Sequence, residues 1–290
     1  MKKLGFIGAG NMAEALIRGL TEGQIFKPAD LIASDADLKR RQLIKRRLKI
    51  ETTADNRSVV DQAAACLIAV KPQQIGEVLA DLAAVFTAAP PATVAAKRGR
   101  REPRTLAVKD RLFISIAAGI TLGRFISVLG PKARVVRVMP NAPAMVGQGM
   151  AGLVGAPGAN KSDLNFALRL FRAVGDAVAL DREDLLDAVT ALSGSGPAYV
   201  YLFVKALTDA AVAEGLPPEL ASRMALQTIR GAEESMRRSP LDAAELIRIV
   251  ASPGGTTEAA LSAFAGSGFP AIVAQAVRAA AERSRELGRG

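Results

Sequence analysis

Short apolar runs alternate with helical patterns through the first 181 residues, and this alternation constrains the fold more than any other feature of the chain. Residues 3–7, 65–70 and 112–117 are apolar runs with the length of buried strands, while residues 13–22 and 74–86 repeat apolar side chains at helical spacing. Two further strands are predicted at residues 30–34 and 135–138, and a charged helix at residues 37–48. Strands that alternate with helices favour a parallel sheet joined by right-handed crossovers.

Strand patterns stop after about residue 181. Helical spacing then appears in five segments, at residues 197–214, 218–237, 242–251, 257–265 and 269–287. These segments are apolar over more than one face, which predicts that they pack against a second copy of the chain. The sequence therefore predicts an α/β domain with a parallel sheet at residues 1–181, followed by an all-α dimerisation domain at residues 182–290.

A glycine-rich turn follows the first predicted strand and opens the first predicted helix. Gly8 allows a tight turn, Gly10 lets the backbone approach a pyrophosphate, and Ala13 permits close packing of the helix on the strand. The N-terminus of that helix then directs its amides and its dipole at the phosphates. This pattern in a strand–turn–helix context predicts a Rossmann-like dinucleotide-binding domain; the alternative is a glycine turn with a structural role alone.

The end of the second predicted strand bears on the choice between NAD and NADP. An acidic residue there, Asp35 or Asp37, would hold the ribose hydroxyls of NAD, whereas Ser34 with the basic residues 39–41 would accept a 2′-phosphate. Asp37 as a helix cap, with residues 39–41 facing solvent, is the structural alternative. We expect NADPH, with NADH as the alternative cofactor.

Two adjacent glycines and two threonines stand at the head of a predicted helix, in the stretch SPGGTT at residues 252–257. The glycines Gly254 and Gly255 let successive backbone N–H groups converge on one point, and the helix N-terminus adds its dipole. Hydroxyls of Ser252 and Thr257 can complete the hydrogen bonds of an anion. We expect a compact anion-binding corner; the alternative is an ordinary cap with Thr at the N-cap position.

Charge and residue counts limit the partners and the chemistry. The net charge is +10, and much of the excess lies in a predicted insertion at about residues 88–110, where an exposed loop is favoured over a nucleic-acid or membrane site. The chain has no His and a single Cys, Cys66, so we expect no metal site and no internal disulfide. No signal peptide and no apolar run of transmembrane length are evident, which predicts a cytoplasmic protein that binds neither membranes nor nucleic acid.

Three further stretches are specific when they are taken with SPGGTT. They are AVKPQ at residues 69–73, VRVMPNAPA at residues 136–144 and AVTALSGSGPAY at residues 188–199. With these motifs in this order, the chain resembles the pyrroline-5-carboxylate reductase family over nearly its whole length. The resemblance implies NAD(P)H-dependent reduction of 1-pyrroline-5-carboxylate to L-proline, the final step of proline biosynthesis. It also implies an interlocked homodimer, and a decamer built from five dimers.

Reduction of a cyclic imine puts hydride on the carbon and a proton on the nitrogen, and Thr257 is our candidate catalytic group, as donor of a hydrogen bond to that nitrogen. The resemblance also implies roles for individual residues. The substrate would contact Ser252, Gly255, Thr256 and Thr257, with Glu183 nearby. The implied cofactor contacts are Ile7, Gly8, Ala9, Gly10, Asn11, Met12, Ser34, Asn56, Val70, Lys71 and Ala118.

Two other classes of protein compete with this interpretation. One is another NADP-dependent imine reductase or a β-hydroxyacid dehydrogenase-like enzyme, which also joins a Rossmann domain to helices. That class shares a helix lysine, Lys205, but expects Asn where this chain has Asp209, and it gives no reason for SPGGTT. The other is a protein that binds nucleotide without catalysis.

Overall fold

The computed structural model describes residues 1–87 and 110–289, which form two compact units. The first unit comprises Met1–Gly194 together with Ala281–Gly290, and the second comprises Ser195–Ala280. The basic insertion predicted at residues 88–110 lies outside the described residues, apart from Asp110.

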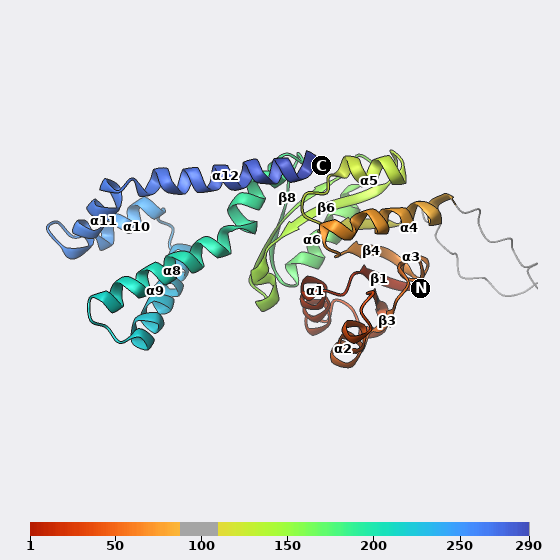
Figure 1. Ribbon diagram of the computed structural model, residues 1–290, viewed down its shortest axis with the longest axis horizontal. Helices are drawn as coiled ribbons and strands as arrows, with labels where there is room; N and C mark the ends of the chain where they lie inside the picture. Colours follow the sequence, from red (N-terminus) through yellow and green to blue (C-terminus); the bar gives the residue numbers. More distant parts are fainter. Residues whose placement is uncertain (88–109, 290) are drawn as a thin grey trace, which may run out of the picture. The chain divides into compact units, whose positions relative to one another are not determined.

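An eight-stranded sheet forms the centre of the first unit (Figure 1). Its strand order is β3-β2-β1-β4-β5-β6-β7-β8. The strands are β1 (Lys2–Ile7), β2 (Leu31–Ser34), β3 (Glu51–Thr53), β4 (Ala63–Ile68), β5 (Leu112–Ser115), β6 (Arg134–Pro140), β7 (Gly149–Gly155) and β8 (Gly175–Ala179). From β3 to β6 this is the order of a doubly wound dinucleotide-binding sheet, with its switch point between β1 and β4. The predicted Rossmann-like class is confirmed.

One strand pair departs from the predicted parallel arrangement. β6 and β7 are antiparallel, whereas the other neighbouring strands run parallel. The connection between them contains only a short 3₁₀ turn, η4 (Ala142–Val146). A parallel return needs a crossover of a dozen or more residues, so this short connection imposes the antiparallel pairing.

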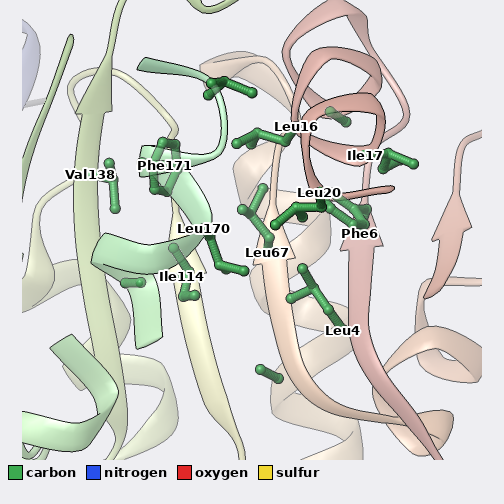
Figure 2. Packing of buried hydrophobic residues seen from close by; sticks show 14 of the residues in the cluster. Leu4, Phe6, Leu16, Ile17, Leu20, Leu67, Ile114, Val138, Leu170 and Phe171 are labelled. Carbon is green, nitrogen blue, oxygen red and sulfur yellow. The ribbon is translucent and has the colours of Figure 1, made fainter. Parts of the chain in front are cut away.

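In the part of the first unit that the structure describes, α-helices cover both faces of the sheet. They are α1 (Asn11–Glu22), α2 (Leu38–Leu48), α3 (Asn56–Gln62), α4 (Ile75–Thr87), α5 (Leu122–Leu129), α6 (Lys161–Arg172) and α7 (Leu185–Val189). Leu16 on α1 and Phe171 on α6 pack with Phe6 on one face, as Figure 2 shows. The opposite face is covered by apolar side chains of α3, α4 and α5.

The alternation within β1 explains why the sheet needs two layers of helices. Leu4 and Phe6 point into one core cluster and Ile7 into the other, and all three side chains are fully buried. Cys66 on β4 is buried in the second cluster, where burial raises the pKa of its thiol to about 12. The thiol therefore acts as a small apolar group.

The second unit is entirely helical in the part that the structure describes. It contains α8 (Gly196–Ala213), α9 (Pro218–Arg238), α10 (Ala243–Val250), α11 (Thr256–Gly266) and the first turns of α12 (Phe269–Arg289). The last turns of α12, from Ala281, belong to the first unit. Among residues 195–280, only the alanines Ala221 and Ala225 are buried apolar residues. These helices therefore have almost no core of their own.

No single helix in residues 1–87 and 110–289 has the length and hydropathy to cross a membrane. Within the same residues, only the pair α11 and α12 taken together has sufficient length and hydropathy, and this pair is bent by 52° at the break between the helices.

Candidate functional site

The β1–α1 turn has the geometry that a phosphate group requires. Gly8 has φ +91°, and a Cβ there would lie 2.8 Å from the carbonyl oxygen of Ala69, so only glycine fits between the ends of β1 and β4. A Cβ on Gly10 would meet no heavy atom within 4 Å. Gly10 is the N-cap of α1 and has no side chain to bond the first amides of the helix. The turn thus combines open space with uncapped helix amides, which suits a pyrophosphate.

At the end of β2, the structure brings two predicted cofactor contacts together. The buried Ser34 hydroxyl donates a 2.7 Å hydrogen bond to Oδ1 of Asn56, which is the first residue of α3. The Asn56 amide in turn donates to Oδ2 of Asp81 at 3.1 Å. These bonds fix the side chains beside the carboxyl end of β2, on the side of the switch point that takes the adenosine half of a dinucleotide.

The acidic and basic residues after β2 make contacts that the sequence left open. The Asp35 carboxylate accepts hydrogen bonds from the backbone N–H of Ala9 at 3.0 Å and of Asp37 at 2.9 Å. It therefore connects the β1–α1 turn to the turn that follows β2. Asp37 caps α2 by accepting from the N–H of Lys39 at 2.8 Å, as the structural alternative predicted. Arg40 donates to the Ala9 carbonyl oxygen and pairs with Glu14 at 2.7 Å.

Arg41 lies across the same turn. Its Nη1 donates to the carbonyl oxygens of Asp35 at 2.7 Å and Ala36 at 2.9 Å. Those contacts use one nitrogen of the guanidinium group and hold the group at the end of β2. Among the residues that the structure describes, Nε and Nη2 of Arg41 have no partner, so both are available to an anion at this edge of the sheet.

The loops after β4 and β5 carry the remaining predicted cofactor contacts. β4 and β5 are parallel neighbours in which Ile68 pairs with Ser115, so their following loops leave from the same edge of the sheet. Val70 and Lys71 follow β4, and Ala118 follows β5. The side chains of Lys71 and Ala118 are exposed at that edge.

Glu183 lies in the first unit, just before α7, and its carboxylate already has two partners. Oε1 accepts from Nη1 of Arg137 at 2.6 Å and from the backbone N–H of Leu122 at 2.8 Å. The other predicted substrate residues, at positions 252–257, belong to the second unit. A shared site between Glu183 and those residues stays a prediction.

In the second unit, the SPGGTT stretch forms the corner between α10 and α11, and its backbone explains both glycines. Gly254 has φ +70°, a conformation that favours glycine. Gly255 is the N-cap of α11, and a Cβ there would lie 2.5 Å from the hydroxyl oxygen of Ser252. Ser252 therefore packs against the glycine backbone, directly beside the start of α11.

The prediction that Gly254 and Gly255 present free amides is wrong. The N–H of Gly254 donates to Oε2 of Glu258 at 2.7 Å, and the N–H of Gly255 donates to the carbonyl oxygen of Ser252 at 3.0 Å. Gly255 gives no side-chain cap, so the alternative of a Thr N-cap is also wrong. In the first turn of α11, the backbone amides of Thr256, Thr257 and Glu258 have no hydrogen-bond partner among the described residues.

Sequence reasoning missed Glu258, although a signal for it exists. Glu258 stands three residues after the N-cap of α11, the position from which an acidic side chain reaches back to the backbone before the helix. The contact of Asp35 with the Ala9 amide has no comparable local signal, because it joins two turns that are 26 residues apart in sequence. Among the described residues, no group of three or more Asp, Glu or Cys side chains could hold a metal ion.

A doubly wound sheet, an open glycine turn and an attached helical unit define a dinucleotide-dependent oxidoreductase. Two family models match this division of the chain. "NADP oxidoreductase coenzyme F420-dependent" matches residues 3–90, and "Pyrroline-5-carboxylate reductase dimerisation" matches residues 183–287. The second match indicates a homo-oligomer that forms through the helices.

Whole-chain relatives identify the family. A pyrroline-5-carboxylate reductase from Pseudomonas aeruginosa is 41% identical over 285 residues, which cover 98% of this chain and 96% of that protein. The structure of a pyrroline-5-carboxylate reductase from Coxiella burnetii has a TM-score of 0.86 and 32% identity, over 99% of this chain and 98% of that one. A Plasmodium falciparum pyrroline carboxylate reductase with NADP bound has a TM-score of 0.80 and 30% identity, over 99% and 98% of the two chains. The chain belongs to the pyrroline-5-carboxylate reductase family.

Proposed function

We propose that this protein reduces 1-pyrroline-5-carboxylate to L-proline with NADPH, the last step of proline biosynthesis, and that NADH is a weaker alternative. The observation that carries the proposal is the uncapped first turn of α11, which presents backbone amides beside the hydroxyl groups of Ser252 and Thr257. A small cyclic imine has one carboxylate as its main polar handle, so an anion-binding helix N-terminus suits it. The family relation at 41% identity supports the same substrate.

The carboxylate would bind the amides of Thr256 and Thr257 and the hydroxyl of Ser252. These donors replace the Gly254 and Gly255 amides of the sequence-based prediction, because both of those amides have internal partners. The Gly255 backbone contributes by letting Ser252 approach the start of the helix. A substrate that is bound by its carboxylate would have its ring fixed in one orientation. Such orientation would supply much of the rate acceleration, because the enzyme has no strong general acid.

Reduction adds a hydride to the imine carbon and leaves a proton on the nitrogen. The reduced nicotinamide supplies the hydride when it is bound. Thr257 would donate a hydrogen bond to the ring nitrogen, and water would deliver protons to this exposed corner. The chain contains no His, so the imidazole acid of many dehydrogenases has no counterpart here.

The cofactor would lie along the carboxyl edge of the sheet across the switch point. Its pyrophosphate would contact the backbone of residues 7–12, and its adenosine half would contact Ser34 and Asn56. Its nicotinamide half would contact Val70, Lys71 and Ala118, which follow the strands on the other side of β1. The open space at Gly10 and the fixed Ser34–Asn56 pair support this placement.

The remaining assignments follow the same family relation. Residues 1–181 would bind the cofactor, and residues 182–290 would hold the substrate and form a homodimer, with five dimers assembling into a decamer. Glu183 would lie near the substrate. We propose a cytoplasmic enzyme without nucleic-acid or membrane partners.

The decisive experiment follows the oxidation of NADPH and NADH with 1-pyrroline-5-carboxylate as the substrate. We expect turnover with both cofactors and a higher kcat/KM with NADPH. Other cyclic imines and 3-hydroxy acids serve as competing substrates. Turnover of those compounds without turnover of 1-pyrroline-5-carboxylate would favour the alternative imine reductase or β-hydroxyacid dehydrogenase-like function.

A variant tests the role of Thr257. Thr257→Ala should lower kcat on the order of tenfold or more, since it removes the hydrogen bond to the reacting nitrogen. Ser262→Ala is the matched control, because Ser262 is an exposed hydroxyl on the same helix, outside the corner. Unchanged kcat in Thr257→Ala would remove Thr257 from the mechanism and leave the assigned substrate standing.

A further inference from the structure

Glu183 joins two elements of the first unit that are distant in sequence. Its Oε1 accepts one hydrogen bond from Arg137, in the middle of β6, and one from the N–H of Leu122, the first residue of α5. The two distances are 2.6 and 2.8 Å. One carboxylate oxygen thus connects the sheet to the N-terminus of a helix, where its negative charge also interacts favourably with the helix dipole.

Arg137 supplies the rigid side of this connection. It is buried to 9% exposure, and its neighbours across the sheet are Ser115 on β5 and Val154 on β7. A buried guanidinium needs a charged partner, and Glu183 is that partner in the structure. Since β6 lies inside the sheet between β5 and β7, the position of Arg137 is set by strand pairing on both sides.

The other side of the connection is the loop between β5 and α5, which contains Ala118. Gly119 in this loop has φ +73°, and a Cβ there would lie 3.1 Å from the carbonyl oxygen of Leu287, near the end of α12. Glu183 holds the end of the loop through Leu122, while Leu287 lies against its middle. The loop is therefore constrained at two points by groups that are not part of the β5–α5 segment.

The location of the loop gives these constraints a function. It leaves the carboxyl end of β5, on the β4 side of the switch point, opposite the Ser34–Asn56 pair at the end of β2. In this type of sheet the two halves of a dinucleotide lie on opposite sides of the switch point. The loop would therefore meet the nicotinamide half and not the adenosine half.

We propose that Glu183 is a positioning residue that, through Arg137 and the Leu122 amide, holds the Ala118 loop where the nicotinamide half of the cofactor binds. This inference rests on the proposed NADPH dependence. It differs from direct substrate contact, because it predicts an effect of Glu183 on cofactor binding when no substrate is present.

The test measures cofactor binding directly. Dissociation constants for NADPH are determined by fluorescence titration, and those for 2′,5′-ADP, which contains only the adenosine half, by calorimetry. We expect Glu183→Ala to weaken NADPH binding about tenfold and to leave 2′,5′-ADP binding unchanged, because a lost charge-assisted contact frees only the nicotinamide-side loop. Glu183→Gln keeps an acceptor for the Leu122 amide and should lie between Glu183→Ala and the wild type.

Asp184→Asn is the matched control. Asp184 lies in the same turn, is 68% exposed and pairs only with Arg182 among the described residues. It should bind both ligands like the wild type. If Glu183→Ala is too unstable for calorimetry, the Glu183→Gln variant gives the same comparison with the carboxylate volume retained.

Each outcome decides the question. Equal weakening of NADPH and 2′,5′-ADP in the Glu183 variants would show a general structural role and overturn the inference. Unchanged NADPH binding with a raised KM for the imine would also overturn it, in favour of substrate contact. Wild-type protein that binds NADPH without reducing the imine would refute the proposed function but would still allow the Glu183 comparison. Wild-type protein that does not bind NADPH would refute both.

Discussion

Two neighbouring arginines after β2 make different contacts, and Arg41 keeps more of its guanidinium nitrogens available to distinguish NADPH from NADH. Arg40 is held between the Ala9 carbonyl oxygen and Glu14. Arg41 uses only Nη1 for the backbone of Asp35 and Ala36. Its remaining nitrogens lie at the strand end where a 2′-phosphate would be placed, and a guanidinium recognises phosphate well.

Arg41→Ala should therefore raise the Kd for NADPH about tenfold and change the Kd for NADH little, since only NADPH carries the phosphate that the guanidinium would bind. Titration of cofactor fluorescence measures both constants. Arg46→Ala is the control, because Arg46 is an arginine with an exposed side chain in the last turn of the same helix. An equal loss of affinity for the two cofactors would place Arg41 in the structure of the turn and not in phosphate recognition.

At the scale of an element, the two glycines of the β1–α1 turn have separable roles. Gly8 is required by the fold, since its φ is +91° and a Cβ would collide with the backbone of Ala69. Gly10 has φ −66°, which alanine adopts easily, and open space around its Cβ position. The two positions therefore allow the structural and the cofactor-binding contributions of one turn to be measured apart.

Gly10→Ala should leave the thermal unfolding midpoint unchanged and weaken NADPH binding about a hundredfold, because the added methyl occupies the space in which the pyrophosphate meets the backbone. Gly8→Ala should lower stability by about 2–4 kcal/mol, because it combines backbone strain with a clash. Differential scanning fluorimetry with and without NADPH records both effects. A destabilised Gly10→Ala variant with normal affinity would contradict the assignment.

The elements that the sequence predicted are those with strong local patterns. The strands β1, β2, β4, β5 and β6 have apolar runs, and the helices α1 and α4 have regular apolar spacing, so their existence follows from burial alone. The charged helix α2 buries only Ile44. β7 has the sequence GMAGLVG, in which three glycines weaken any strand signal, and β3 has only three residues. These strands are stabilised by pairing with neighbours, which a local pattern does not contain.

In the candidate site, too, the sequence predicts the motifs but not the contacts that form only in the folded chain. The glycine turn and the SPGGTT corner were both predicted, because each needs particular residues at fixed spacing. Which amides of the corner are free was predicted wrongly, since that depends on the rotamer of Glu258 and on the turn hydrogen bond to Ser252. The partners of Glu183 come from β6 and from α5, so only the folded sheet reveals them.

At the scale of the whole molecule, the helical unit is incomplete as a single chain. Apolar side chains on α8, α10 and α12 are exposed, including Leu202 at 69%, Ile249 at 68% and Ile272 at 57%. In the described residues 195–280, the buried apolar side chains are two alanines. A unit with so little core needs a partner surface, and a second copy of the same helices provides one with matching apolar character.

Leu202→Asp should therefore shift the protein from dimers to monomers. In a two-fold interface the substitution occurs twice, so it places two carboxylates in an apolar environment and should weaken association by at least about a hundredfold. Sedimentation equilibrium measures the mass of the wild type and the variant, and the thermal midpoint should fall as the helical unit loses its partner. Leu38→Asp on α2 of the first unit, where the leucine is 57% exposed, is the matched control and should keep the wild-type mass. If Leu202→Asp also kept that mass, α8 would lie outside the interface, and the apolar faces of α10 and α12 would have to form it alone.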